Sequence, residues 1–100
     1  MHLVSLPPLL DFMRKHPDAK QPILAWCDEV KMARWRKPAD IMAHYASASI
    51  LKSRRVVFNL KGSEYRLIVA IAYSVGFVYV KFIGTHAQYE AVDANTVELF

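Results

Sequence analysis

The feature that most constrains the fold is a change of hydrophobic period halfway along the chain. Apolar and polar residues alternate in three segments, RRVVFNL (54–60), YRLIVAIAY (65–73) and FVYVKFI (77–83). A period of two is typical of strands that bury one face. The intervening segments, KGSE (61–64) and SVG (74–76), suit tight turns. The sequence therefore predicts three consecutive antiparallel strands.

Before these strands, apolar residues recur at helical spacing. A short strand is expected at HLVS (2–5), and a helix then starts at Pro7 and Pro8 and is ended by Pro17. The apolar side of this helix is predicted to contain Leu9, Leu10, Phe12 and Met13.

A second helix is predicted to begin where Asp18 and Gln21 resemble a capping box. Pro22 fits only the first turn of such a helix. A third, short helix is expected from Pro38 to Tyr45. The core-facing residues of the second helix are predicted to be Ile23, Trp26, Cys27 and Val30, and Trp26 and Trp35 are expected to be packing anchors.

Helices followed by strands predict one α+β domain over residues 1–100, with helices covering one face of an antiparallel sheet. A length of 100 residues and a hydrophobic fraction of 54% suit a single globular core. The single cysteine, Cys27, excludes an internal disulfide and is expected to be buried.

The turns set the register of the predicted strands. A two-residue turn at Gly62 and Ser63 and a tight loop around Val75 and Gly76 each fix which residues lie opposite one another. The expected cross-strand pairs are Lys61 with Glu64, Leu60 with Tyr65, Asn59 with Arg66, Tyr73 with Val78, and Ala70 with Lys81.

Alternation then assigns the strand residues to two faces. The core face is predicted to carry Val56, Phe58, Leu60, Tyr65, Leu67, Val69, Ile71, Val78, Val80 and Phe82. The second face is predicted to carry Arg55, Val57, Asn59, Lys61, Arg66, Ile68, Tyr79, Lys81 and Ile83, a mixture of cations, amides and apolar residues suited to an anion.

Charge and hydropathy narrow the function classes. Thirteen Lys and Arg residues against nine Asp and Glu give a net charge of +4, which favours a polyanionic partner such as nucleic acid. The longest apolar run, LIVAIAY (67–73), is far shorter than the roughly 20 residues of a membrane span. The N-terminal segment lacks the pattern of a secretory signal, so we expect a cytoplasmic protein without a membrane segment.

The segment GTHAQYE (84–90) carries the most specific chemical signal. Thr85 suits the N-cap of a short helix that follows the last strand. On that helix His86, Tyr89 and Glu90 share one face, because offsets of three and four are neighbouring positions. Three proton-handling side chains can therefore act on the same group of atoms.

Beside the predicted cations, these groups match the needs of metal-free RNA cleavage, which requires no cofactor. A base must remove the 2′-hydroxyl proton, cations must stabilise charge on phosphorus, and an acid must protonate the departing 5′-oxygen. His86 suits either proton role near neutral pH. Arg66 suits bidentate phosphate binding and Lys61 suits a point contact. Tyr89 can donate a proton, bind phosphate or stack on a base.

Other interpretations remain open at this point. His86 can be a capping or packing residue, or it can ligate a metal together with Glu90. Arg54 and Arg55 are either solvated edge charges or RNA contacts. The whole chain can instead be a noncatalytic module that binds RNA or the ribosome through phosphate contacts.

Three long segments resemble the HigB toxins of bacterial type II toxin–antitoxin systems, a branch of the RelE superfamily. They are HPDAKQPILAWCDEVKMARWRKPADI (16–41), ASILKSRRVVFNLKGSEYRLIVAI (48–71) and VKFIGTHAQYEAVDA (80–94), in the family's order and at similar spacing. The resemblance implies a RelE-like microbial-ribonuclease fold, with N-terminal helices on one face of an antiparallel sheet and a short C-terminal helix. It also implies an mRNA interferase that cuts messenger RNA on the ribosome and is neutralised by a HigA-type helix-turn-helix antitoxin.

The resemblance also implies site residues. The family pattern N-x-K-G-x-x-x-R falls on Asn59, Lys61, Gly62 and Arg66, and T-H-x-x-Y falls on Thr85, His86 and Tyr89. This chain has Glu90 where similar sequences commonly have Asp, Ala72 where many have Asn, and Lys81 where Arg is frequent. The expected catalytic residues are His86, Arg66, Tyr89 and Lys61, and the expected RNA-binding residues are Asn59, Arg55, Lys81 and Glu90.

Overall fold

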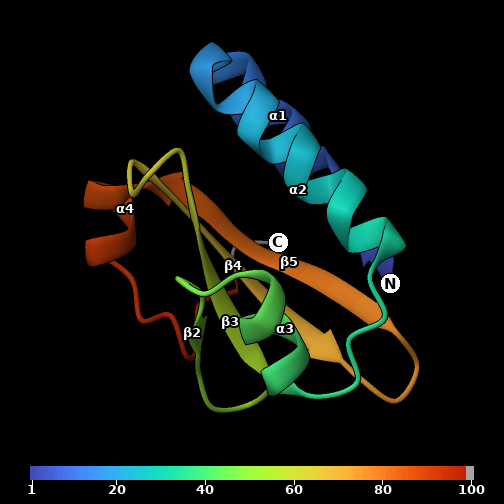
Figure 1. Cartoon of the computed structure of the whole chain (residues 1–100). Coiled ribbons are helices and arrows are strands. Elements are labelled where there is room, and N and C mark those ends of the chain that lie inside the picture. The colour runs from blue at the N-terminus through green and yellow to red at the C-terminus, as the bar shows by residue number, and fades with distance from the viewer. Residues whose placement is uncertain (99–100) are drawn as a thin grey trace.

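The computed structural model describes residues 1–98. Five strands form one mixed sheet, and helices pack beside it (Figure 1). The strands are β1 (His2–Val4), β2 (Ser49–Ile50), β3 (Arg55–Leu60), β4 (Tyr65–Ala72) and β5 (Phe77–Thr85), and they lie in the order β1-β5-β4-β3-β2. The three central strands are antiparallel, as the alternation predicts. β1 adds to β5 in parallel, and the unpredicted β2 adds to β3 at the other edge.

The helices are α1 (Pro7–Lys15), the 3₁₀ helix η1 (Pro17–Ala19), α2 (Lys20–Met32), α3 (Pro38–His44) and α4 (His86–Glu90). Figure 1 shows α1 and α2 running alongside each other next to the sheet. The predicted helix starts at the prolines and the short helix after the last strand are confirmed. Within residues 1–98, no helix combines the length and the apolar character that a bilayer crossing requires.

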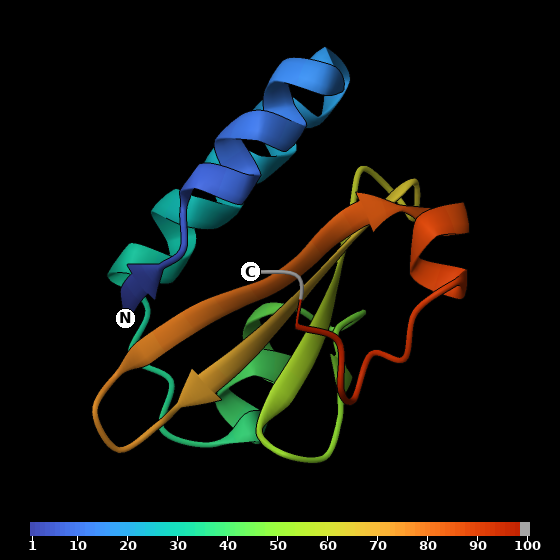
Figure 2. The same ribbon diagram turned by 180° about the vertical axis from the view of Figure 1, so that it is seen from behind.

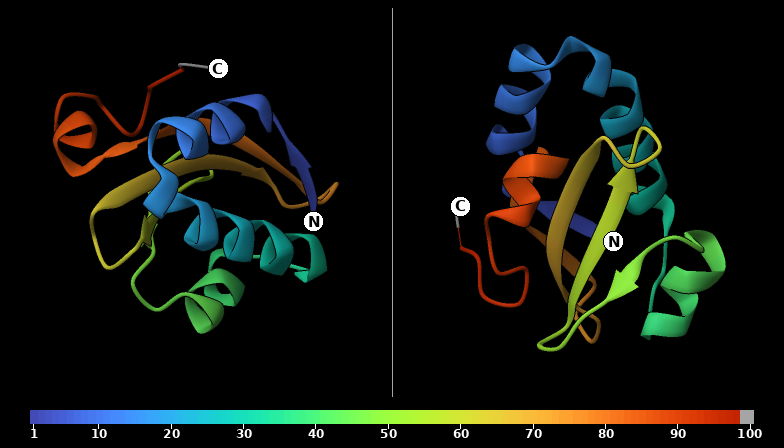
Figure 3. Two further views of the ribbon diagram at one scale, coloured as in Figure 1. Left: turned by 90° about the horizontal axis from the view of Figure 1, so that it is seen from above. Right: turned by 90° about the vertical axis from the view of Figure 1, so that its left-hand side faces the viewer.

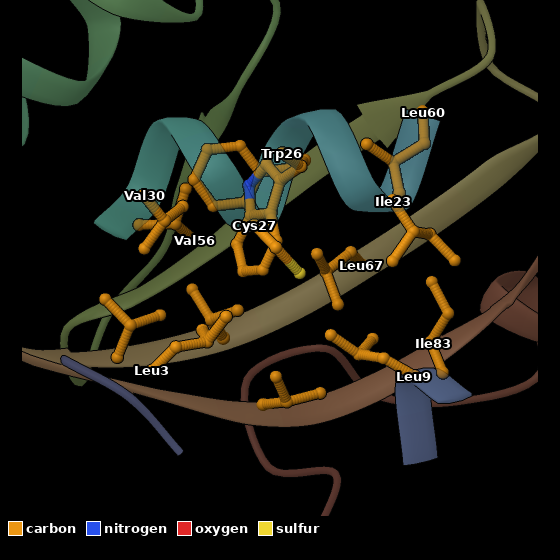
Figure 4. Close-up of a cluster of buried hydrophobic side chains, with 14 of the residues drawn as sticks. Leu3, Leu9, Ile23, Trp26, Cys27, Val30, Val56, Leu60, Leu67 and Ile83 are labelled. Carbon is orange, nitrogen blue, oxygen red and sulfur yellow. The ribbon is translucent and has the colours of Figure 1, made fainter. Parts of the chain in front are cut away.

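The main core lies between these helices and the sheet. Figure 4 shows Trp26 and Ile23 of α2 over the strands, with Leu9 of α1 beside them. The predicted burial of Cys27 and of both tryptophans is confirmed. The prediction that Leu10 lies on the buried side of α1 is wrong. Leu10 is 55% exposed, and the buried residues of this helix are Leu9 and Phe12.

The predicted capping box at Asp18 is wrong, because no side chain caps the N-terminus of α2. One carboxylate oxygen of Asp18 accepts from the Lys61 ammonium at 2.6 Å, and the other accepts from the Tyr65 hydroxyl at 2.5 Å. These contacts tie η1 to the end of the β3–β4 hairpin. The hydrogen bond from Lys61 is the main reason that the pKa of Asp18 lies below its ordinary value of 3.8.

The register of the β3–β4 hairpin is confirmed. Leu60 lies opposite Tyr65 and Asn59 lies opposite Arg66. The amide of Glu64 donates to the carbonyl of Lys61 at 3.2 Å, which closes a two-residue turn. Gly62, the first central residue of this turn, has a φ of 72°, which glycine adopts without steric cost.

The predicted register of the β4–β5 hairpin is wrong. Its loop spans the four residues between Ala72 and Phe77, which lie opposite each other. Val78 therefore pairs with Ile71 instead of Tyr73, and Ala70 pairs with Tyr79 instead of Lys81. The shift of two residues keeps every side chain of this part of the hairpin on its predicted face, because the side-chain period is also two.

A β-bulge in β5 changes the faces beyond it. Val69 pairs with Val80 and Ile68 pairs with Phe82, so Lys81 is the extra residue. After the bulge, Ile83 points into the main core beside Leu9 (Figure 4) and Phe82 joins the opposite face. The predicted faces of Phe82 and Ile83 are therefore exchanged. Alternation could not predict this, because two adjacent apolar residues satisfy either arrangement.

The second face of the sheet carries a small core of its own. Val57, Ile68 and Phe82 are buried there. Figures 2 and 3 show the segment after α4 on this side of the sheet, while α2 and α3 lie on the other side. Val97 packs against this small core, and Leu99 and Phe100 lie outside the described residues. The residues packed against it are Leu51, Tyr89, Val92, Ala94 and Val97.

The bulge gives a first prediction. Ile83→Ala should lower the free energy of unfolding by about 2 to 5 kcal/mol, because it empties a packed site in the main core. In a regular strand the same residue would lie on the other face. Denaturant unfolding measures the effect, and Leu10→Ala, at a residue 55% exposed, is the control that should change little. Equal effects of the two substitutions would contradict the assigned faces.

The contacts of Asp18 give a second prediction. Its pKa is lowered in the folded state, so its contribution to stability is complete above the ordinary value of 3.8 and is lost as the pH falls through the folded value. Asp18→Asn should therefore flatten the fall of unfolding free energy that begins as the pH drops toward the ordinary value of 3.8 and continues below it. Asp11→Asn, which removes an exposed carboxylate of α1, should leave that fall unchanged.

Candidate functional site

The site forms where β5 ends beside the start of β4. Thr85 caps α4 with a capping box: its hydroxyl accepts from the Gln88 amide at 3.2 Å, and its own amide donates to Oε1 of Gln88 at 2.8 Å. Gly84 lies opposite Arg66, and a Cβ at this glycine would fall 2.6 Å from the Phe82 ring. A larger residue at Gly84 would therefore push α4 or Phe82 away from the sheet.

Arg66, His86 and Glu90 form a continuous row. A guanidinium nitrogen of Arg66 lies 3.2 Å from Nδ1 of His86, and Nε2 of His86 lies 2.8 Å from the Glu90 carboxylate. Arginine can only donate, so Nδ1 is the acceptor and the ring proton lies on Nε2, facing Glu90. The imidazole side chain is 51% exposed, so a substrate can reach it.

The ring of Tyr89 packs against the guanidinium of Arg66. The Arg66 guanidinium carbon lies 5.0 Å from the centre of the Tyr89 ring, a cation–π contact. The same ring packs against the small core of the second face. Tyr89 therefore restricts where Arg66 can point.

Asn59 lies opposite Arg66 on the neighbouring strand. Its amide nitrogen donates to the carbonyl of Ser47 at 3.0 Å. Its oxygen Oδ1 and the Nε of Arg66 are both buried and have no hydrogen-bond partner among the residues that the structure describes. Unpartnered buried polar atoms are uncommon, and a ligand bound at this pair of positions would supply the missing partners.

Lys61 is not next to the row, although the sequence predicts it there. Its ammonium contacts Asp18 at 2.6 Å and Glu64 at 3.4 Å, on the helix side of the hairpin. The hydrogen bond to Asp18 is the main reason that its pKa is raised. Lys61 has a φ of 51° at the start of the turn, so the alternation of the strand does not extend to its side chain.

Arg55 and Lys81 lie on the second face but are occupied by the C-terminal segment. Arg55 is only 5% exposed, and its guanidinium donates to the carbonyls of Ala94 and Val97. The Glu98 carboxylate accepts from Arg55 at 2.5 Å and from Lys81 at 2.9 Å. Glu98 therefore compensates one of these two positive charges, and the C-terminal segment covers part of the second face.

Asp18 and Glu98 were not predicted to contact these cations. The tail shows no motif, and the three pairs are separated by 43, 43 and 17 residues, so no local spacing predicts them. Glu90, in contrast, contacts His86 as their spacing of four suggests. In the described part of the chain, no group of three His, Cys, Asp or Glu side chains is arranged to hold a metal ion.

Comparison with known proteins identifies the family. Residues 19–92 match the HigB toxin family, described as the RelE-like toxic component of a toxin–antitoxin system. The chain is also 26% identical over 92 residues to the mRNA interferase toxin HigB of Escherichia coli K12, which covers 90% of this chain and 88% of that protein. The mRNA interferase HigB proteins of Escherichia coli O157:H7 and Shigella flexneri match to the same extent.

The match covers every element from α2 to α4, including the strand that carries Arg66 and the helix that carries His86. The observed α+β architecture, with N-terminal helices beside the sheet and a short C-terminal helix, agrees with a RelE-like fold. The chain therefore belongs to the HigB family of RelE-like toxins.

Proposed function

We propose that this chain is a metal-independent endoribonuclease that cuts messenger RNA on the ribosome and thereby inhibits translation. We further propose that it acts in the cytoplasm and that a HigA-type helix-turn-helix antitoxin neutralises it. Family membership and three relatives described as mRNA interferases support the proposal. The chemistry of the row formed by Arg66, His86 and Glu90 supports it independently.

One observation carries the proposal: Arg66 is bonded to an imidazole and not to a carboxylate. Each of the other predicted cations, Lys61, Arg55 and Lys81, is in contact with an acidic side chain. Within residues 1–98, Arg66 has no carboxylate within salt-bridge distance, so its positive charge remains available for an anion. A phosphate diester is the anion that a planar guanidinium binds best through two hydrogen bonds.

Phosphate binding at Arg66 prepares His86 for proton transfer. A charged phosphate is a stronger acceptor than a neutral imidazole, so the guanidinium leaves Nδ1 when the phosphate binds. The freed lone pair then accepts the 2′-hydroxyl proton, while Glu90 holds the proton on Nε2 and orients the ring. A carboxylate that orients a histidine base in this way also stabilises the imidazolium that forms.

The reaction is then an internal displacement at phosphorus. The 2′-oxygen attacks as its proton moves to His86, the bond to the 5′-oxygen breaks, and the departing oxygen takes a proton from an acid. The products are a 2′,3′-cyclic phosphate and a 5′-hydroxyl. The substrate supplies its own nucleophile, so this route needs no metal-bound water.

Tyr89, Asn59 and Lys61 have supporting roles in this proposal. Tyr89 holds Arg66 under the phosphate through its ring, and Asn59, opposite Arg66 on the neighbouring strand, contributes to RNA binding. Lys61 is 39% exposed and joins the site when its ammonium exchanges Asp18 for a phosphate. A noncatalytic RNA-binding module is the alternative that the experiments below exclude or support.

The central prediction concerns the row itself. His86→Ala should lower the cleavage rate about 10² to 10⁴ fold, since it removes the proton acceptor. Arg66→Ala should lower it by about 10² to 10³ fold through the loss of charge stabilisation. The measurement is single-turnover cleavage of a defined message on ribosomes, with and without a chelator, followed by analysis of the RNA ends for a cyclic phosphate.

Matched controls are available in the chain. His44→Ala removes another histidine that contacts a carboxylate, since its Nε2 lies 3.1 Å from Glu29. Arg14→Ala removes an arginine that is 79% exposed on α1. Both controls should cleave at the wild-type rate. Full activity of His86→Ala and Arg66→Ala would eliminate this site, and RNA binding without any cleavage by the wild type would favour the noncatalytic module.

Tyr89 gives a separate prediction. If its ring acts by holding Arg66, Tyr89→Phe should keep most of the activity, and Tyr89→Ala should lose at least about tenfold because the cation–π contact disappears. The same cleavage assay compares the two variants, with thermal unfolding to confirm that both fold. Equal and large losses would show that the hydroxyl itself takes part in proton transfer.

A further inference from the structure

The C-terminal segment places a carboxylate where two cations converge. Glu98 accepts hydrogen bonds from Arg55 through one oxygen and from Lys81 through the other. The two contacts measure 2.5 and 2.9 Å. A guanidinium and an ammonium that hold both oxygens of a carboxylate present donors that can also bind a phosphate.

Among residues 1–98, all the hydrogen-bond acceptors of the Arg55 guanidinium come from this segment. They are the carbonyls of Ala94 and Val97 and the carboxylate of Glu98. A guanidinium with only 6% of its side chain exposed requires such partners, because an uncompensated buried charge is costly. The cation pair is therefore arranged around an anion, and the chain supplies that anion itself.

The cation pair lies on the same face as the candidate active site. Arg55 pairs with Ala70 and Asn59 pairs with Arg66, so the two positions are four residues apart along β4, about 13 Å. The chain that follows α4 covers the sheet between them (Figures 2 and 3). An RNA strand whose scissile phosphate lies on Arg66 would meet this segment if it continued along the sheet.

We propose that Arg55 and Lys81 form a second phosphate subsite for the RNA strand, and that Glu98 fills this subsite in the free protein. The C-terminal segment is then an internal competitor of RNA. The inference rests on the proposed function, because it takes RNA as the ligand of this face. It deepens that function by assigning a regulatory role to a residue that no sequence motif marks.

Replacement of Glu98 by an RNA phosphate does not leave the two cations without an anion. Both states keep Arg55 and Lys81 in contact with an anion, so neither cation is left without a partner. The hydrogen bond from Lys81 is the main reason that the pKa of Glu98 is lowered, so this carboxylate is charged near neutral pH. Displacement of the tail exposes the small core of Val57, Ile68 and Phe82, which RNA bases can cover by stacking.

The test measures binding and not cleavage. A short 2′-O-methyl RNA lacks the nucleophilic hydroxyl, so its dissociation constant is defined even if the enzyme is inactive. Glu98→Gln should bind this RNA about three to ten times more tightly than the wild type, because it weakens the competing state. Asp11→Asn makes the same change of net charge on the exposed side of α1 and should alter the affinity less than twofold.

A double variant tests whether Glu98 acts through the cation pair. In a Lys81→Met background, Glu98→Gln should increase the affinity by less than half as much, since one cation of the subsite is gone. Hydrogen exchange of the wild type should show faster exchange of the amides of residues 94–98 when the 2′-O-methyl RNA binds. Thermal unfolding checks that each variant folds.

Three results would overturn the inference. The first is equal affinity of Glu98→Gln and Asp11→Asn, the second is an undiminished effect in the Lys81→Met background, and the third is unchanged protection of residues 94–98 in the RNA complex. Each of these results is compatible with normal cleavage by the wild type. Failure of the competitor inference is therefore distinguishable from failure of the proposed ribonuclease site.

Discussion

The β-bulge at Lys81 is the constraint on which the arrangement of both faces depends. One extra residue in β5 moves Ile83 into the main core and sends Phe82 to the second face. It also brings Gly84 opposite Arg66 and starts α4 beside that arginine. Without the bulge, the last residues of β5 would present their opposite sides, and His86 would leave the strand in a different direction.

Charge compensation divides the basic residues into two kinds. Lys61, Arg55 and Lys81 each contact an acidic side chain from a distant segment, and these contacts tie η1 and the C-terminal segment to the sheet. Arg66 contacts the neutral ring of His86 and the face of Tyr89. A net charge of +4 therefore does not produce a uniformly basic surface, and among the cations predicted for the second face, the one without an acidic partner in residues 1–98 lies beside the proton-handling groups.

Local patterns predicted much of the fold because their physical causes are local. The period of two located β3, β4 and β5, prolines located α1 and α3, and a glycine turn fixed the pairing of Asn59 with Arg66. The longer β4–β5 loop gave a wrong register, since its sequence does not specify a turn length. At the candidate site, the i to i+4 spacing of His86 and Glu90 predicted their contact, and the hairpin register placed Arg66 on the expected strand.

The sequence by itself determined most of the secondary structure, the core stripe of α2 and the residues that can perform acid–base chemistry, because spacing along one helix or strand decides each of these. Only the tertiary structure decided which cations are free. Asp18 reaches Lys61 and Glu98 reaches Arg55 across 43 residues of chain, and the bulge decides which side of β5 faces them. Contacts of that kind depend on how whole elements pack. The acidic partner of a cation can lie anywhere in the sequence, so no regular spacing predicts it.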